Sequence, residues 1–367
     1  MLKAGIVGLP NVGKSTLFNA LIHARKAAAE NFPFCTIEPN LGVVHVPDPR
    51  LEKLAKLAGV ERRVPTAIEF VDIAGLVCGA SQGEGLGNQF LSHIREVDAI
   101  IQVVRCFEDE DVHHVAGSLD PLRDISIVST ELILADLESL RKRQERISRD
   151  LKRHDKHAEA EERVLEKLVQ HLDGGRPANT LALHHEERVL AATVPLLTDK
   201  PTLFVANVDE GTLAAPQANP HVARVQEYAR AHHACDTVVV CAKLESDLID
   251  LGPEEAGEYL RSLGVEEGGV EALIHATYRL LKLRTFFTFN DTEARAWTVR
   301  AGETAPRAAG RIHTDFERGF IKAETIGMAD LEACGSIAHA RERGLYRMEG
   351  KDYEVKDGDV IHFKFHV

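Results

Sequence analysis

Residues 8–15, GLPNVGKS, match the pattern GxxxxGK[ST] of a phosphate-binding loop. In such a loop, backbone N–H groups and the N-terminus of the following helix face the phosphates of a nucleotide. An apolar stretch at residues 5–7 precedes the loop, and apolar residues at helical spacing follow it. The context therefore predicts a nucleoside triphosphate site, in which Lys14 reaches the β- and γ-phosphates and Ser15 ligates Mg²⁺. The residues of this segment expected to bind the nucleotide are Asn11, Val12, Gly13, Lys14, Ser15 and Thr16.

A second motif lies at residues 68–75, IEFVDIAG, where an apolar strand ends in a DxxG turn. An acid at the end of a strand, here Asp72, can hold Mg²⁺ through its water shell, and the amide of Gly75 can meet the γ-phosphate. The glycine-rich segment that follows, residues 79–87, suits a switch that changes conformation with the γ-phosphate. The predicted cofactor is Mg²⁺, and its predicted ligands are Ser15, Thr36 and, through water, Asp72.

Residues 207–210, NVDE, differ from the NKxD stretch of guanine-specific GTPases, whose Asp accepts two hydrogen bonds from guanine N1–H and the 2-amino group. Val208 replaces the Lys, and Glu210, one methylene longer, replaces the Asp; both are expected, with Asn207, to bind the nucleotide. Adenine offers no such pair of donors, so a guanine-specific carboxylate would stay unpaired against it. The departure favours ATP, with Asn207 recognising the adenine 6-amino group or N7. Residues 241–243 form the second base-side loop, which contributes Cys241 and Ala242.

The hydrolytic residues also depart from those of small GTPases. Leu76 stands where those proteins carry a Gln that orients the attacking water, so the water must be positioned from elsewhere or turnover is slow without a partner. His114 is the best local candidate, because imidazole orients or deprotonates water near neutral pH. A surface histidine without a catalytic role remains the alternative.

Composition limits the class of protein. A chain of 367 residues suits two or three domains. It has no run of roughly 18 apolar residues and no signal-peptide pattern at its start, so we expect a cytoplasmic protein without membrane contact. The six cysteines form no CxxC pair, and the adjacent histidine pairs lack acidic or Cys partners at ligand spacing. A net charge of −13 argues against diffuse binding to nucleic acid.

Apolar β-branched runs alternate with helical patterns over the first hundred residues, which indicates an α/β fold with a mostly parallel sheet. Charged helical stretches at 127–157 and 159–172 carry apolar residues at heptad-like steps and predict an inserted antiparallel coiled-coil hairpin, with its turn near 154–161. A small α+β domain begins near residue 284. The predicted domains are a nucleotide-binding domain at 1–125 and 200–283, the hairpin at 126–199, and a C-terminal domain at 284–367.

The predicted hairpin concentrates basic residues on an otherwise acidic protein. Two interpretations fit: a solvated helix face partly neutralised by Glu138 and Glu145, or a surface that faces RNA. The basic residues are Arg141, Lys142, Arg143, Arg146, Arg149, Lys152, Arg153 and Lys156.

Together these motifs resemble the YchF group of Obg-related P-loop proteins, the Obg-like ATPases. The resemblance rests on GLPNVGKST at 8–16, NFPFCT at 31–36, DIAGL at 72–76, GEGLGN at 83–88 and NVDE at 207–210. RAWTV at 295–299, IHTDF at 312–316 and KDYEVKDGD at 351–359 resemble the TGS domain of that group. The resemblance runs from residue 1 to residue 367 in the same domain order.

The resemblance implies hydrolysis of ATP in preference to GTP and a catalytic histidine that matches His114. Lys14 and Gly75, assigned from their motifs, complete the predicted catalytic residues. The resemblance also implies association with the ribosome and a ubiquitin-like β-grasp fold for the C-terminal domain; it implies no sequence-specific DNA binding. Two functions stay open: a slow ATPase that acts as a translation-associated switch, and a nucleotide-gated ribosome-binding or protein-binding module that uses GTP. A P-loop kinase fits less well, because no lid-like Arg cluster accompanies the loop.

Overall fold

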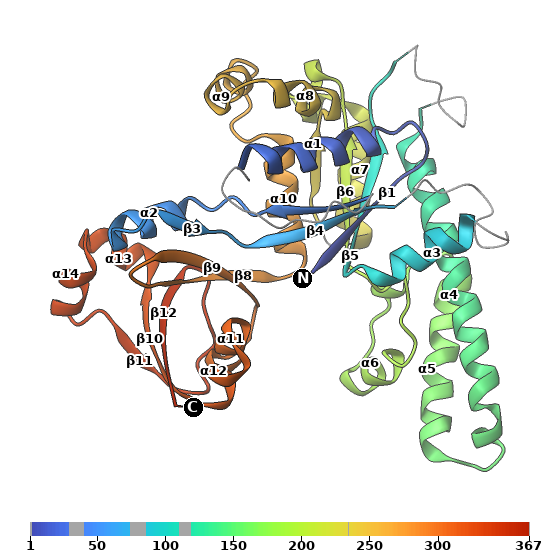
Figure 1. Cartoon of the computed structure of the whole chain (residues 1–367). Coiled ribbons are helices and arrows are strands. Elements are labelled where there is room, and N and C mark those ends of the chain that lie inside the picture. The colour runs from blue at the N-terminus through green and yellow to red at the C-terminus, as the bar shows by residue number, and fades with distance from the viewer. Residues whose placement is uncertain (1, 29–39, 74–85, 110–118, 234, 367) are drawn as a thin grey trace. The chain divides into compact units, whose positions relative to one another are not determined.

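The computed structural model describes residues 2–28, 40–73, 86–109, 119–233 and 235–366 (Figure 1). The chain divides into two compact units, the first formed by Met1–Val44 and Glu69–Thr277 and the second by His45–Ile68 and Tyr278–Val367. No helix within the described ranges is both long enough and apolar enough to cross a membrane.

The first unit is built on a six-stranded sheet of order β2-β4-β1-β5-β6-β7. Its central strand β5 is buried along its whole length, which is typical of a parallel strand covered on both faces. The pairs β4–β1, β1–β5, β5–β6 and β6–β7 are all parallel, so the carboxyl ends of these strands meet at one edge. The strands are β1 (Lys3–Val7), β2 (Leu41–His45), β4 (Ala67–Asp72), β5 (Ala99–Arg105), β6 (Thr202–Asn207) and β7 (Thr237–Val240).

Helices connect these strands in the crossover pattern expected from the sequence. Helix α1 (Lys14–Ala28) follows β1, and α3 (Leu86–Glu96) precedes β5. Helix α7 (Pro220–His233) lies between β6 and β7 in the chain, and α8 (Ala242–Asp247), α9 (Pro253–Ser262) and α10 (Gly269–Leu280) follow β7. The short helix α6 (His185–Ala191) precedes β6. The predicted α/β class with a mostly parallel sheet is therefore confirmed.

A pair of helices, α4 (Pro121–Leu151) and α5 (Lys156–Asp173), stands between β5 and β6 in the chain. The two lie side by side and extend away from the sheet (Figure 1). The turn occupies residues 152–155, slightly earlier than predicted, because Asp155 caps α5 by accepting a hydrogen bond from Ala158 N at 2.9 Å. The shared core of the pair includes Leu137, Leu140, Ile147, Val164, Leu165, Leu168 and Leu172. Two packed helices are thus present, and coiled-coil pairing stays a prediction.

A buried ion pair joins the two helices. Arg143 donates from Nε and Nη2 to the two carboxylate oxygens of Glu161 at 2.7 and 2.9 Å, and Thr193 Oγ1 donates to the same carboxylate at 2.9 Å. The Glu161 side chain is only 2% exposed. The hydrogen bonds from Arg143 hold the pKa of Glu161 below its usual value of 4.5.

Arg143→Ala is expected to lower the free energy of unfolding of the helical pair by about 3 kcal/mol, because it leaves a buried carboxylate without its cation. The pair contributes above the usual Glu pKa, and this contribution is lost as the pH falls through the lowered pKa. Hydrogen exchange of the α4 and α5 amides at pH 7, with urea unfolding at pH 7 and about pH 3, measures both effects. Arg141→Ala is the control, because Arg141 is 64% exposed and lies 3.9 Å from Asp173; a loss as large in this variant would contradict the prediction.

The second unit has its own six-stranded sheet, of order β11-β10-β12-β8-β9-β3. Strands β8–β9, β10–β12 and β10–β11 pair antiparallel, whereas β12–β8 and β3–β9 pair parallel. Helices α2, α13 and α14 share one core with this sheet, and α11 contributes to the other. The elements are α2 (Pro49–Ala58), β3 (Arg62–Val64), β8 (Leu283–Phe289), β9 (Glu293–Arg300), α11 (Ala305–Ile312), α12 (Thr314–Arg318), β10 (Phe320–Gly327), α13 (Met328–Cys334), α14 (Ile337–Glu342), β11 (Arg347–Glu349) and β12 (Asp359–Phe365).

Residues 45–68 belong to this second unit, although the expected boundaries placed them in the nucleotide-binding domain. Helix α2 turns Leu51, Leu54 and Ala55 into the core that also holds Phe287 and Ile326. Strand β3 then adds to the edge of the sheet beside β9. The apolar face of α2 is therefore covered by strands that come more than 200 residues later in the chain.

Candidate nucleotide-binding site

The phosphate-binding loop lies at the carboxyl edge of the first sheet, between β1 and α1. Asn11 and Gly13 have positive φ values of 63° and 88°, so the backbone reverses sharply before the helix begins at Lys14. Gly8 admits no side chain, because a Cβ there would lie 2.9 Å from both Val103 O and Val12 Cγ2. A glycine is thus required where the loop crosses the neighbouring strand.

Lys14, Ser15 and Asp72 come together at this edge, as the two motifs predicted. Lys14 is 9% exposed, and its Nζ donates a hydrogen bond to Asp72 Oδ1. Ser15 Oγ lies 3.4 Å from Asp72 Oδ2. A hydroxyl and a carboxylate oxygen at this spacing are the hard ligands that Mg²⁺ prefers, so the residues present fit the predicted metal.

Asn207, at the end of β6, ties the phosphate-binding loop to the base-side loop. Its Nδ2 donates to Val12 O at 2.9 Å, and its Oδ1 accepts from Ala242 N at 2.9 Å. The residue is only 4% exposed. An amide has two N–H donors, so one remains for a base after this bridge is made. The bridge was not predicted; recognition of adenine by Asn207 stays a prediction.

Val208 directly follows β6. Its side chain is 2% exposed and packs in the core that includes Phe204, Val222 and Val225. Its side chain therefore supports the sheet, and nucleotide binding by Val208 stays a prediction. Glu210 is exposed and accepts a hydrogen bond from Tyr259, whereas Cys241 is buried at the start of α8.

Three predicted site residues, Thr36, Gly75 and His114, lie outside the described residues, as does Leu76. The roles given to them accordingly stay predictions: Thr36 as a hydroxyl ligand of Mg²⁺, the Gly75 amide as a contact of the γ-phosphate, and His114 as the residue that positions the attacking water.

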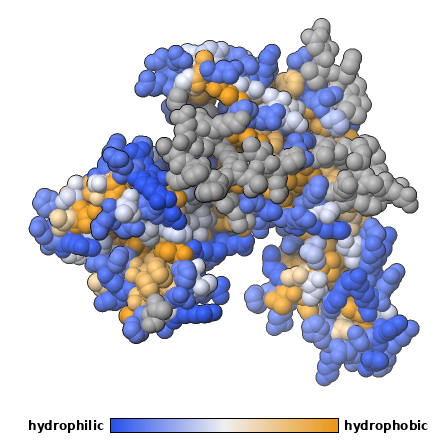
Figure 2. Space-filling view, viewed as in Figure 1, coloured by the Kyte–Doolittle hydropathy of each residue, from blue (hydrophilic) through white to orange (hydrophobic). Residues whose placement is uncertain are grey.

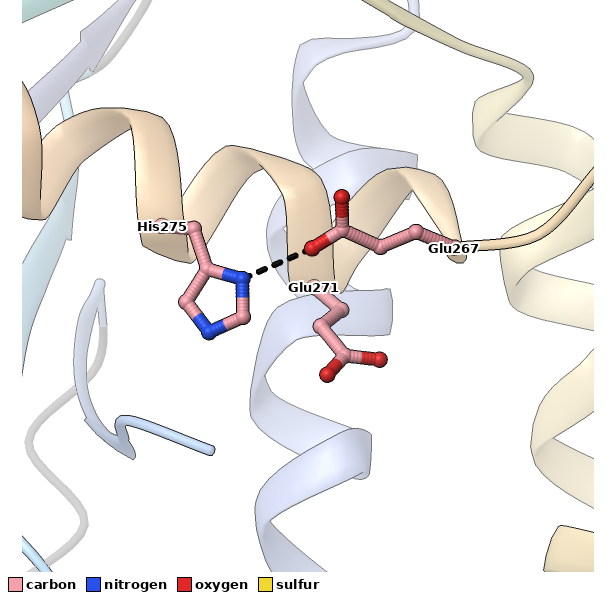
Figure 3. Close-up of side chains that lie close together, drawn as sticks. All are labelled: Glu267, Glu271 and His275. Carbon is pink, nitrogen blue, oxygen red and sulfur yellow. Dashed lines mark hydrogen bonds and ion pairs between the residues drawn. The ribbon is translucent and has the colours of Figure 1, made fainter. Parts of the chain in front are cut away.

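A separate group of metal-ligating side chains was missed from the sequence. Glu267, Glu271 and His275 offer ligand atoms within 4.8 Å of one another, at the start of α10 and along it. Figure 3 shows the His275 ring directed at the Glu267 carboxylate, and the Nδ1···Oε1 distance is 2.7 Å. The i, i+4, i+8 spacing could have revealed the group. The contact between His275 and Glu267 accounts for the close approach of those two side chains.

Comparison with known proteins extends over the whole chain. A Bacillus subtilis protein named "Ribosome-binding ATPase YchF" is 53% identical over 366 residues, which cover 100% of both chains. The chain belongs to the YchF family. The resemblance inferred from the motifs is thus confirmed, and a Haemophilus influenzae protein of the same name is 52% identical over 100% of this chain and 99% of its own.

A solved structure and a family model agree with this placement in the YchF family. The "Structure of the Schizosaccharomyces pombe YchF GTPase" superimposes with a TM-score of 0.87 at 36% identity, covering 99% of this chain and 97% of that one. A GTP binding protein from Pyrococcus horikoshii, 18% identical, matches in fold with a TM-score of 0.62. The model described as "50S ribosome-binding GTPase" matches residues 3–128, and the YchF C-terminal model, described as "Protein of unknown function (DUF933)", matches 283–366.

Proposed function

We propose that this YchF-family protein is a Mg²⁺-dependent ATPase that prefers ATP to GTP and acts as a slow, nucleotide-driven switch on the ribosome. In this role it regulates translation or a stress response in the cytoplasm. The observation that carries the proposal is the convergence of Lys14, Ser15 and Asp72 at the phosphate-binding loop. The curated relatives are named ribosome-binding ATPases, which supports both parts of the proposal.

The paired residues have complementary tasks when a nucleotide binds. Lys14 would transfer its charge from Asp72 to the β- and γ-phosphates, which would leave the Asp72 carboxylate available to hold Mg²⁺ through water. Ser15 would hold the ion through its hydroxyl. Bound Mg²⁺ neutralises the charge that develops on the phosphate oxygens. The Gly75 amide holds the γ-phosphate, and His114 orients the attacking water.

Calorimetric titration of nucleotide-free protein with ATP and with GTP, each with Mg²⁺, tests the base preference. Tighter binding of ATP supports the proposal. A clear preference for GTP would favour the second candidate, a nucleotide-gated ribosome-binding module of the Obg GTPase type. Two observations favour that candidate: the Schizosaccharomyces pombe structure is described as a GTPase, and the model that matches residues 3–128 is described as a ribosome-binding GTPase.

The exposed cations of α4 are the proposed contact with ribosomal RNA. Lys142, Arg146 and Arg149 line a groove on one helix face together with Glu145. Hydrophilic residues cover this end of the helical pair (Figure 2). Arg143 is excluded from the contact, because Glu161 already binds its guanidinium. We propose that the C-terminal unit is a TGS-type β-grasp. Its strand and helix surfaces supply the second contact with the ribosome.

Replacing both Arg146 and Arg149 by Ala is expected to weaken ribosome binding about tenfold and to lower the salt slope of the binding constant by about 2, because two phosphate contacts are lost. Cosedimentation with ribosomes at several salt concentrations measures this. The matched control replaces Arg224 and Arg230 of α7, which carry the same charge and have Asp120 and Asp236 as partners. An equal loss in the control would show a general charge effect instead of a contact through α4.

A further inference from the structure

One face of the second sheet is covered by helices at one end and carries exposed lysines at the other. Ile326 and Val360 lie opposite each other on β10 and β12, in the core that the sheet shares with α2, α13 and α14. Alternate residues of a strand point to the same face, so Lys322 and Lys364, four residues away on each strand, belong to this face. Both lysines are exposed. We call this exposed end the β10–β12 face.

The two lysines face each other directly, because Lys322 pairs with Lys364 in the antiparallel ladder. Like charges in this position repel each other and destabilise a sheet. Within the described residues, neither ammonium group forms an ion pair with a carboxylate. An anion bound by both side chains would relieve the repulsion, so the pair suits a phosphate group.

A hollow of about 340 Å³ opens beside His362, which lies two residues before Lys364 on β12. Its walls include Phe289, Arg341 and Tyr346. The guanidinium of Arg341 lies 5.5 Å from the centre of the Tyr346 ring. The Tyr346 hydroxyl is buried and has no hydrogen-bond partner in the described part of the chain. Flat aromatic and guanidinium surfaces are those on which the bases of single-stranded RNA stack, and the hydroxyl can bond to a base edge.

Acids also lie near these cations. Arg341 is 4.0 Å from Glu324, which faces His362 across the ladder, and it partly neutralises that carboxylate. Asp291 lines the hollow, where its carboxylate can accept a hydrogen bond from the amino group of a base. Partial burial lowers the pKa of His362, and the positive charge of Lys364 lowers it further, so the ring is neutral at pH 7. The excess charge of the face is therefore positive and lies at the lysine pair.

We propose that the β10–β12 face binds single-stranded RNA, with phosphate at the lysine pair and a base in the hollow beside Tyr346. One nucleotide can reach both parts of the face, because His362 is only two residues, about 7 Å, from Lys364 along β12. Double-stranded RNA keeps its bases paired and cannot place one in the hollow. The inference rests on the proposed contact with the ribosome and names the surface and the kind of RNA through which the C-terminal unit makes it.

Replacing both Lys322 and Lys364 by Ala tests the phosphate contact. The full chain, already carrying Arg146→Ala and Arg149→Ala to weaken the contact through α4, is titrated into a fluorescein-labelled single-stranded oligoribonucleotide of mixed sequence. Fluorescence anisotropy is expected to show binding weakened about tenfold by loss of the lysine pair. The salt slope of the binding constant is expected to fall by about 1.4, because each phosphate contact on a single strand contributes about 0.7.

A control and a second variant separate the phosphate contact from the base contact. Arg311→Ala with Arg318→Ala removes the same charge from α11 and α12, which pack on the opposite face of the sheet, and is expected to change binding less than about threefold. Tyr346→Leu keeps an apolar side chain but removes the ring and its hydroxyl. It is expected to weaken binding about tenfold with an unchanged salt slope, because stacking releases no counterions. Urea unfolding of each variant checks that the second unit stays folded.

Unchanged RNA affinity after loss of the lysine pair, or an equal loss in the arginine control, would overturn the inference. Cosedimentation with ribosomes separates it from the proposed function. Weaker ribosome binding by Lys322→Ala with Lys364→Ala, at unchanged affinity for the oligoribonucleotide, would assign the face to a ribosomal protein and overturn the RNA contact. An unsubstituted protein that does not sediment with ribosomes would overturn the proposed function, and the anisotropy result alone would then decide whether the face binds RNA.

Discussion

Lys14→Ala is expected to lower the rate of ATP hydrolysis about a thousandfold, because the protein loses the cation that stabilises charge on the transferred phosphoryl group. The Lys14 side chain is 10% exposed, so solvent has little access to its position and cannot compensate for the lost ammonium group. The substitution also leaves Asp72 without its partner in the nucleotide-free protein. Single-turnover release of phosphate at saturating ATP measures the chemical step apart from binding.

Lys3→Ala is the control for this experiment. Lys3 lies in β1 of the same sheet, 36% exposed and 3.7 Å from Glu69, so its removal takes away a surface ion pair. Hydrolysis in the control is expected to stay within about twofold of the unsubstituted rate. A loss of less than about tenfold in Lys14→Ala would contradict the assignment of this lysine to the transition state.

Gly13→Ala is expected to lower the free energy of unfolding of the first unit by about 3–5 kcal/mol and to abolish measurable nucleotide binding, because the new Cβ displaces Asn207. That Cβ would stand 2.2 Å from Asn207 Nδ2, at a position whose φ is +88°. Asn207 cannot move without breaking its hydrogen bonds to Val12 O and Ala242 N. The phosphate-binding and base-side loops are then no longer held together.

Gly59→Ala separates backbone strain from collision. Gly59 has a φ of +70°, and a Cβ there meets nothing within 4 Å. This control is expected to cost about 1–2 kcal/mol in the second unit and to leave nucleotide affinity unchanged. Chemical unfolding followed by circular dichroism, with fluorescence titration of a labelled nucleotide, compares the two variants. Retained nucleotide binding in Gly13→Ala would contradict the structural role assigned to Asn207.

Much of the site could be predicted because its signals are local. The loop at 8–15 carries its own strand and helix context, and Asp72 ends an apolar run, so the meeting of Lys14 with Asp72 follows from parallel pairing of β1 and β4. The helical pair could also be predicted, because apolar residues recur at regular steps among the charged residues of both helices.

The remainder depends on contacts between distant parts of the chain, which a local pattern cannot show. The bridge formed by Asn207 needs the ends of β6 and β7 to be adjacent, and an Asn at a strand end does not reveal that both ends of its amide are engaged. Val208 stands where guanine-specific GTPases carry a Lys, and the sequence does not show that its side chain packs into the core. Tyr259 lies in a helix without any motif.

The discontinuous second unit has a consequence for synthesis on the ribosome. Helix α2 and strand β3 leave the exit tunnel roughly 210 residues before the strands that cover them. At a synthesis rate of about 5–20 residues per second, the apolar side chains of Leu51 and Leu54 therefore stay uncovered for about 10–40 s. During that interval, in which the rest of the first unit is synthesised, the nascent chain exposes the apolar face of an amphipathic helix, and a chaperone that shields residues 45–68 would raise the yield of native protein.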